Sequence, residues 1–194
     1  MAASSVEVCN SALIKLGAST ISSLSDGTKG ANLCNAQYDR LRKEVLRAHP
    51  WNFAVSFVAL ASTGNTPVWA DYTAEFTIPS DVLRILDTDL LYDQEWEIGY
   101  NASGNKVLFT SASAVKIRYI KDITNTTRFD TCFDEVLAAR IAADISYSMV
   151  QSQSVQQNMF RIYEQLLRDA RSFDAQEHSA EQVQADEFTT AVRG

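Results

Sequence analysis

The sequence predicts an α+β fold: helices from both ends of the chain form a bundle, a central antiparallel β meander is inserted between them, and a C-terminal arm follows. Two observations predict this class, an apolar period of three to four residues near both ends and a strict alternation in the middle. The expected parts are the bundle (1–51 and 122–173), the β insertion (52–121) and the arm (174–194).

Two helices are predicted in the N-terminal part. Ser4 and Glu7 have the spacing of a capping box, and apolar residues then recur in steps of three and four, which predicts a helix over 5–16. A second apolar stripe predicts a helix over 28–48. Pro50 fixes its end, because a proline disfavours the helical conformation in the residue before it.

The alternation in the middle of the chain predicts five or six strands. The segments YTAEFTI, EWEIGY and VKIRYIK each place apolar residues on one side and polar residues on the other. In EWEIGY, we expect Trp96 and Ile98 to face the core. Glu95 and Glu97 should then face water. Turn-forming stretches rich in Gly, Asn, Ser and Pro separate the segments, so residues 52–121 should form an antiparallel meander.

Helical periodicity returns after the predicted strands, over 130–150 and 154–173. Residues 174–194 are polar and acidic, with isolated apolar residues such as Phe188 and Val192. Such a segment buries too little surface to order alone. Two interpretations stay open: a disordered tail, or a segment that orders on a partner with Phe188 and Val192 as anchors.

Composition excludes several classes of protein. The chain has 24 acidic and 17 basic residues and a net charge of −7, so it lacks the basic surface that wraps DNA. No apolar run approaches the roughly 20 residues of a membrane span, and we expect no membrane partner. The first ten residues lack a basic region followed by an apolar one, so we expect no signal peptide and a cytoplasmic product.

Neither a metal nor a cofactor is expected. Cys9, Cys34 and Cys132 lie far apart, and their odd number argues against a disulfide framework. With only His49 and His178 beside them, the cysteines are best interpreted as small buried residues on helix faces.

No catalytic motif stands out, and we expect no enzyme. A G-x-S-x-G motif and a P-loop are missing from the sequence. The densest acidic cluster consists of Asp87, Asp89, Asp93, Glu95 and Glu97. A glycosidase needs two carboxylates across a bond, so a glycan hydrolase using this cluster is the alternative function. A solvated strand face is the simpler interpretation.

One basic cluster occurs in the second predicted helix: Arg40, Arg42, Lys43 and Arg47. It is interpreted as a solvated helix face, as a contact with the acidic surface of a neighbouring subunit, or as a surface facing DNA.

The helix-to-strand corner has its own signature. Pro50 stops the helix, and Trp51 and Phe53 open the β insertion with no linker. We expect these aromatic rings to pack at the junction of bundle and sheet and to fix the angle of the β part.

Three segments together resemble a known family: CNSALIKLGASTISSL, ANLCNAQYDRLRKEVLRAHPWNFA and FDEVLAARIAADIS. They are similar to the head-to-tail adaptor proteins of short-tailed bacteriophages, also called tail tubular protein A or gateway proteins. The shared features include Tyr38, Asp39 and Arg42 in a helix that closes on HPWNFA. The similarity spans about residues 8–173.

The resemblance implies a structural, non-enzymatic part of the virion, located in the neck of the tail and assembled in the host cytoplasm. Twelve copies would form a ring beneath the portal ring, extend the DNA channel and carry the tail nozzle, or tubular protein B. DNA would pass through without specific binding, which suits a negatively charged chain.

In relatives the C-terminal segment reaches along the portal. The side chains expected to do so here are Val183, Phe188, Val192 and Arg193, although the arm itself matches no family motif. Some relatives are described as having hydrolase activity, but nothing in this chain supplies its residues. A third possibility is a host-type helical interaction module with no phage role.

Overall fold

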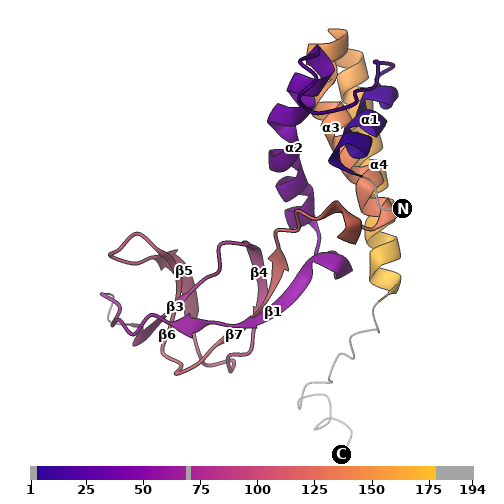
Figure 1. Cartoon of the computed structure of the whole chain (residues 1–194). Coiled ribbons are helices and arrows are strands. Elements are labelled where there is room, and N and C mark those ends of the chain that lie inside the picture. The colour runs from indigo at the N-terminus through magenta and orange to yellow at the C-terminus, as the bar shows by residue number, and fades with distance from the viewer. Residues whose placement is uncertain (1–3, 69–70, 178–194) are drawn as a thin grey trace, which may run out of the picture.

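The computed structural model describes residues 4–68 and 71–177. In this part of the chain the helices stand side by side, and short strands project from one end of them, so that the molecule is L-shaped (Figure 1). The predicted α+β class, with helices at both ends and antiparallel strands between them, is confirmed.

Local capping explains where the helices begin. The Ser4 hydroxyl accepts from the backbone N–H of Glu7, whose side chain accepts from Ser4 in return, and Asp130 caps the third helix. The helices are α1 Ser5–Lys15, α2 Lys29–Ala48, α3 Thr131–Val150 and α4 Gln153–Gln176. Within the described residues, none of them has the length and apolar character that a membrane crossing needs.

The core of the helical part centres on α3, which contacts the other three helices. Four alanines of α3 are completely buried, and their small side chains let the neighbouring helices approach closely: Ala138, Ala139, Ala142 and Ala143. Larger side chains such as Leu13, Leu41 and Leu137 fill the remaining space and are also completely buried.

The strands form two antiparallel sheets. The first has the order β1-β7-β4, with β1 Val55–Ala59, β7 Lys116–Lys121 and β4 Val82–Thr88. The second has the order β2-β3-β6-β5, with β2 Ala61–Ser62, β3 Ala74–Thr77, β6 Lys106–Thr110 and β5 Trp96–Tyr100. The strands therefore do not pair in chain order, as a meander would. The reason is that the chain enters and leaves the β part at the helices, so its first and last strands must meet.

Burial of the strands depends on distance from the helices. In the segment that ends with β7, Val115, Ile117 and Tyr119 are buried, as their alternation predicted. In β5, by contrast, Trp96 and Ile98 are each 39% exposed, so the prediction that they face the core is wrong. This strand is the edge of the second sheet, and its side chains lack the covering that β7 has.

Candidate functional site: the elbow between helices and sheets

The elbow, which we define as residues 47–54, is where α2 ends and the chain turns into β1. His49 adopts an extended conformation (φ −148°, ψ 147°), as expected for a residue before a proline. One turn of 3-10 helix over Asn52–Ala54 then leads into the strand. The direction change thus takes only a few residues.

Side chains from three separate segments cap the end of α2. The last four carbonyls of a helix have no partner within it. Three of those carbonyls accept a hydrogen bond from a side chain. The Val45 carbonyl accepts from Trp51 Nε1 (3.0 Å), the Arg47 carbonyl from Arg84 Nη1 (3.1 Å) and the Ala48 carbonyl from Arg171 Nη2 (2.8 Å). These donors come from the elbow, from β4 and from α4. The end of α2 is therefore fastened to both the sheet and the last helix.

An aromatic cluster packs beneath the elbow. Trp51 is 1% exposed and meets the ring of Phe133 edge-on, with 5.3 Å between centroids. Phe53 contacts the same ring at 5.1 Å and also lies 5.8 Å from Phe129. Edge-to-face pairs of this kind add to the gain from burial. The structure thus places Trp51 and Phe53 between α2, β1 and the start of α3, beside Pro50.

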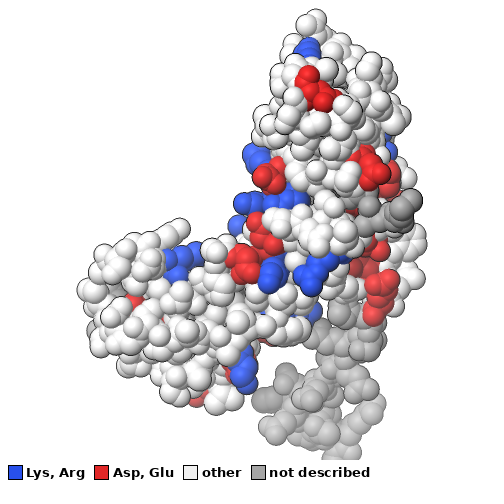
Figure 2. All heavy atoms as spheres, viewed as in Figure 1, with Lys and Arg blue, Asp and Glu red and all other residues white. Residues whose placement is uncertain are grey.

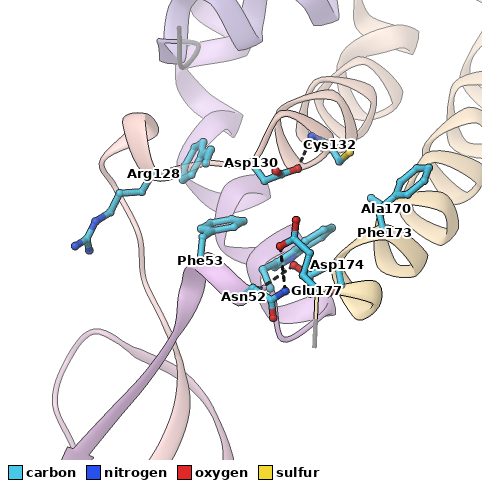
Figure 3. Close-up of a pocket in the computed structure, with 11 residues that line it drawn as sticks. Asn52, Phe53, Arg128, Asp130, Cys132, Ala170, Phe173, Asp174 and Glu177 are labelled. Atoms are coloured by element: carbon cyan, nitrogen blue, oxygen red, sulfur yellow. Dashed lines mark hydrogen bonds between the residues drawn. The ribbon is translucent and has the colours of Figure 1, made fainter. Parts of the chain in front are cut away.

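Asp174, in the last turn of α4, joins that helix to the elbow. Its carboxylate accepts from the backbone N–H of Asn52 at 3.0 Å and lies 2.9 Å from His49 Nε2. The Asn52 amide in turn donates to the Asp174 carbonyl at 2.9 Å (Figure 3). The predicted arm began at 174, but residues 174–176 still belong to α4. The first residue of the predicted arm, Asp174, therefore binds the elbow and belongs to the folded part of the chain.

Burial decides the protonation of His49. The desolvation of its ring lowers the pKa of His49 below 6.5, and this effect outweighs the pull of the Asp174 carboxylate. The imidazole is therefore neutral at pH 7. Its proton lies on Nε2, because a carboxylate oxygen only accepts.

A second joint lies where the chain leaves the sheets. Arg42 of α2 is 2% exposed, bonds the Asp122 carboxylate and donates to the carbonyl of Ile123 at 2.6 Å. The prediction that Arg42 contacts a neighbouring subunit is wrong, because its guanidinium is enclosed within its own chain. Asp122 lies eighty positions further along the sequence, which hides this pair from local pattern analysis.

The other members of the basic cluster remain at the surface. Arg40 bonds Asp144 of α3 at 2.9 Å, and Lys43 lies 3.5 Å from Asp122. Arg47 is exposed at the end of α2. These three side chains are accessible to another molecule, whereas Arg42 is not.

A cavity of about 290 Å³ lies between the elbow, the start of α3 and the end of α4 (Figure 3). Cys132 lines it, but burial and the neighbouring Asp130 carboxylate raise the pKa of its thiol, so it is a poor nucleophile near neutral pH. Among the described residues, no group of three or more His, Cys, Asp and Glu side chains is placed to hold a metal ion. What this geometry supports is a rigid joint.

The acidic cluster of the predicted hydrolase alternative lies at the surface. All five side chains, Asp87, Asp89, Asp93, Glu95 and Glu97, are exposed. The Asp89 carboxylate accepts from the backbone N–H of Lys116 at 2.6 Å, and Asp87 accepts from Thr88 at 2.8 Å. The general acid of a glycosidase lies in a protected pocket, which differs from these surroundings.

One buried carboxylate escaped the sequence analysis. Glu75 of β3 is buried, and its Oε1 accepts from Asn65 Nδ2 (2.9 Å), Thr63 Oγ1 (2.7 Å) and Asn101 Nδ2 (3.0 Å). These donors hold the pKa of Glu75 below its ordinary value of 4.5. Glu75 therefore ties two loops to the second sheet. The alternation of the sequence predicts that Glu75 faces the polar side of the strand. The asparagines in the flanking turns were the only sign in the sequence that it could be buried.

The proposed portal-binding side chains, Val183, Phe188, Val192 and Arg193, lie outside the described residues, as does His178. Neither models of known protein families nor curated protein sequences match this chain. Its role must be inferred from the elbow and from the motifs that form it.

Proposed function

We propose that the chain is a structural head-to-tail adaptor of a phage virion, twelve copies of which form a ring between the portal and the tail nozzle and extend the DNA channel. One observation carries the proposal. Two of the features through which the sequence resembles this family, Arg42 and the HPWNFA segment, fasten the two crossings between helices and sheets.

Such a joint suits a subunit of a ring. The helices supply a body that can pack beside identical bodies, and the elbow holds the β part away from that body at one angle (Figure 1). Every copy in a symmetric ring must present the same angle, because the next component of the tail meets all of them together. A mobile joint would make that platform irregular.

The charge of the chain also supports the proposal. A net charge of −7 disfavours adhesion of the phosphate backbone, which is useful in a conduit through which DNA must slide. We propose that the ring sits in the neck of the virion tail after assembly in the host cytoplasm.

The arm is expected to supply the portal contact. Residues 178–194 directly follow Glu177, which lines the cavity at the elbow. Light scattering of the purified chain, alone and mixed with its portal ring, tests this. We expect twelve copies on the portal for the full chain and loss of binding for a chain ending at Glu177.

The truncation should end at Glu177 because Asp174 binds Asn52 of the elbow, and its removal would affect folding as well as binding. The shortened chain should keep the circular dichroism and melting temperature of the full chain. A full chain that does not bind the portal ring would overturn the proposal. Cleavage of a polysaccharide that disappears in Glu97→Gln would favour the hydrolase instead.

A further inference from the structure

Two exposed arginines, one at the elbow and one beside it, form no ion pair with another described residue. Arg84 donates to the Arg47 carbonyl at 3.1 Å, so it lies against the end of α2 that carries Arg47. Both side chains are exposed, and neither forms an ion pair with any residue in 4–68 or 71–177. The nearby Lys43 and Lys121, by contrast, each have a carboxylate within 3.5 Å.

These side chains lie on the surface near the junction of helices and sheets. Figure 2 shows Lys and Arg there, with Asp and Glu among them. The surface lies in the inner angle of the L, at the base of α2 and on β4 (Figure 1). We define the basic elbow as Arg47 and Arg84.

The opposite charge lies beyond β4, in the loop and edge strand that follow it. We define the acidic tip as residues 91–97, which contain Asp93, Glu95 and Glu97. All three carboxylates are exposed, and none forms an ion pair within the described part of the chain. The sequence from 85 to 105 contains no Lys or Arg to neutralise them.

The acidic tip also exposes large apolar side chains. Tyr92 is completely exposed, Leu91 is about two thirds exposed, and Trp96 is partly exposed. An acidic loop with an aromatic residue at its apex combines two features of protein contacts, an aromatic anchor and charges that orient the approach.

We propose that the acidic tip of one copy docks on the basic elbow of the next copy. The charges left unneutralised on the two surfaces are opposite, and a contact between copies would neutralise both. Because the two surfaces are different parts of the same chain, the contact is head-to-tail and repeats from copy to copy, as a ring requires. The inference rests on the proposed ring and names the residues that would hold its neighbours together.

Photo-cross-linking tests the contact directly. Tyr92 is replaced by a benzoyl-phenylalanine, and the variant is mixed with isotope-labelled wild-type chain, free at rising concentration and bound to the portal ring. Mass spectrometry then identifies the labelled peptide that is captured. We expect labelled peptides around Arg47 and Arg84 among those captured, because the label shows that the captured peptide comes from another copy.

Charge reversal adds a second readout. Arg47→Glu in the labelled chain should lower the cross-linking yield about tenfold, and Glu95→Arg in the other chain should restore most of it. Arg161→Glu serves as the control, because Arg161 is also an exposed arginine but lies on α4. Its yield should equal that of wild type.

The outcomes separate this contact from the adaptor role. Twelve copies on the portal with capture of other peptides would overturn the contact and leave the adaptor role standing. Capture of the basic elbow by a chain that never binds the portal would support the contact and contradict the adaptor role. Duplex DNA binding that Arg47→Glu removes, with cross-linking unchanged, would assign the basic elbow to nucleic acid and also overturn the contact.

Discussion

The helical part of the molecule has a larger set of buried apolar side chains than the β part. In the helices, Leu13, Leu41 and Ile141 are completely inaccessible to solvent. In the sheets, Phe57 is 75% exposed, and Tyr100 is similarly accessible.

The difference indicates that the helical part and the β part are stabilised in different ways. The helices stabilise one another through a continuous core around α3. The sheets have a smaller core of their own and depend on the two joints at Arg42 and at the elbow. A part that is held firmly at its base and left uncovered at its end is suited to receive another molecule.

The largest effect is expected at the elbow. Trp51→Ala should lower the free energy of unfolding by about 3–5 kcal/mol, because it empties a buried aromatic site, and it also removes the hydrogen bond to the Val45 carbonyl. Chemical denaturation measures this. Trp96→Ala is the matched control in the β part and should cost less than about 1 kcal/mol, since Trp96 is partly exposed. Equal losses of unfolding free energy in Trp51→Ala and Trp96→Ala would contradict the difference between the elbow and the edge of the β part.

The second joint should respond almost as strongly. Arg42→Met leaves the Asp122 carboxylate without its buried partner and should cost about 3 kcal/mol. Arg40→Met, at an exposed position, should cost less than about 1 kcal/mol. Adding Asp122→Leu to Arg42→Met should recover part of the loss, because the carboxylate that lost its buried partner is then removed. Wild-type stability in Arg42→Met would argue against a joint at this position.

An intermediate effect is expected within the β part. Glu75→Ala should cost about 1–3 kcal/mol, because its three donors lose their acceptor. Hydrogen exchange should accelerate near Asn65 and Asn101 while the helices keep their protection. Glu97→Ala is the control on the exposed edge strand and should change neither quantity. Faster exchange in α3 would mean that the two parts are less independent than their cores indicate.

The smallest effect is a dependence on pH. The pKa of His49 lies below 6.5 in the folded chain, so the unfolded chain binds this proton more readily. Stability should therefore fall as the pH drops through 6.5 and below. The melting temperature between pH 7 and 5 should fall more steeply for wild type than for His49→Gln. Parallel curves would show that the buried imidazole does not contribute.

The helices could be predicted closely because their signals are local. The capping box at Ser4 and the stop at Pro50 each involve residues within one turn, and the observed ends differ from the predictions by three residues at most. The end of α4 was misplaced, because Asp174 belongs to the helix through its contacts with Asn52, far away in sequence.

The β part could be predicted only in outline. Alternation identifies which residues share a side of a strand, but it cannot say whether a layer covers that side, as Trp96 shows. Pairing of β1 with β7 joins residues more than fifty positions apart, and the alternation within each strand does not predict which strand it pairs with. Burial of Glu75 depends on Asn101 in the same way.

Within residues 4–68 and 71–177 the chain passes between the two parts at two places, and these lie side by side, because Val55 at the entry pairs with Ile120 at the exit. The β part is thus an insertion whose ends meet, which is the arrangement that tolerates exchange of whole segments. Evolution can replace the inserted module while the helices, their packing and both anchoring points stay the same. A different module fits the same helices as long as these two crossings keep their places.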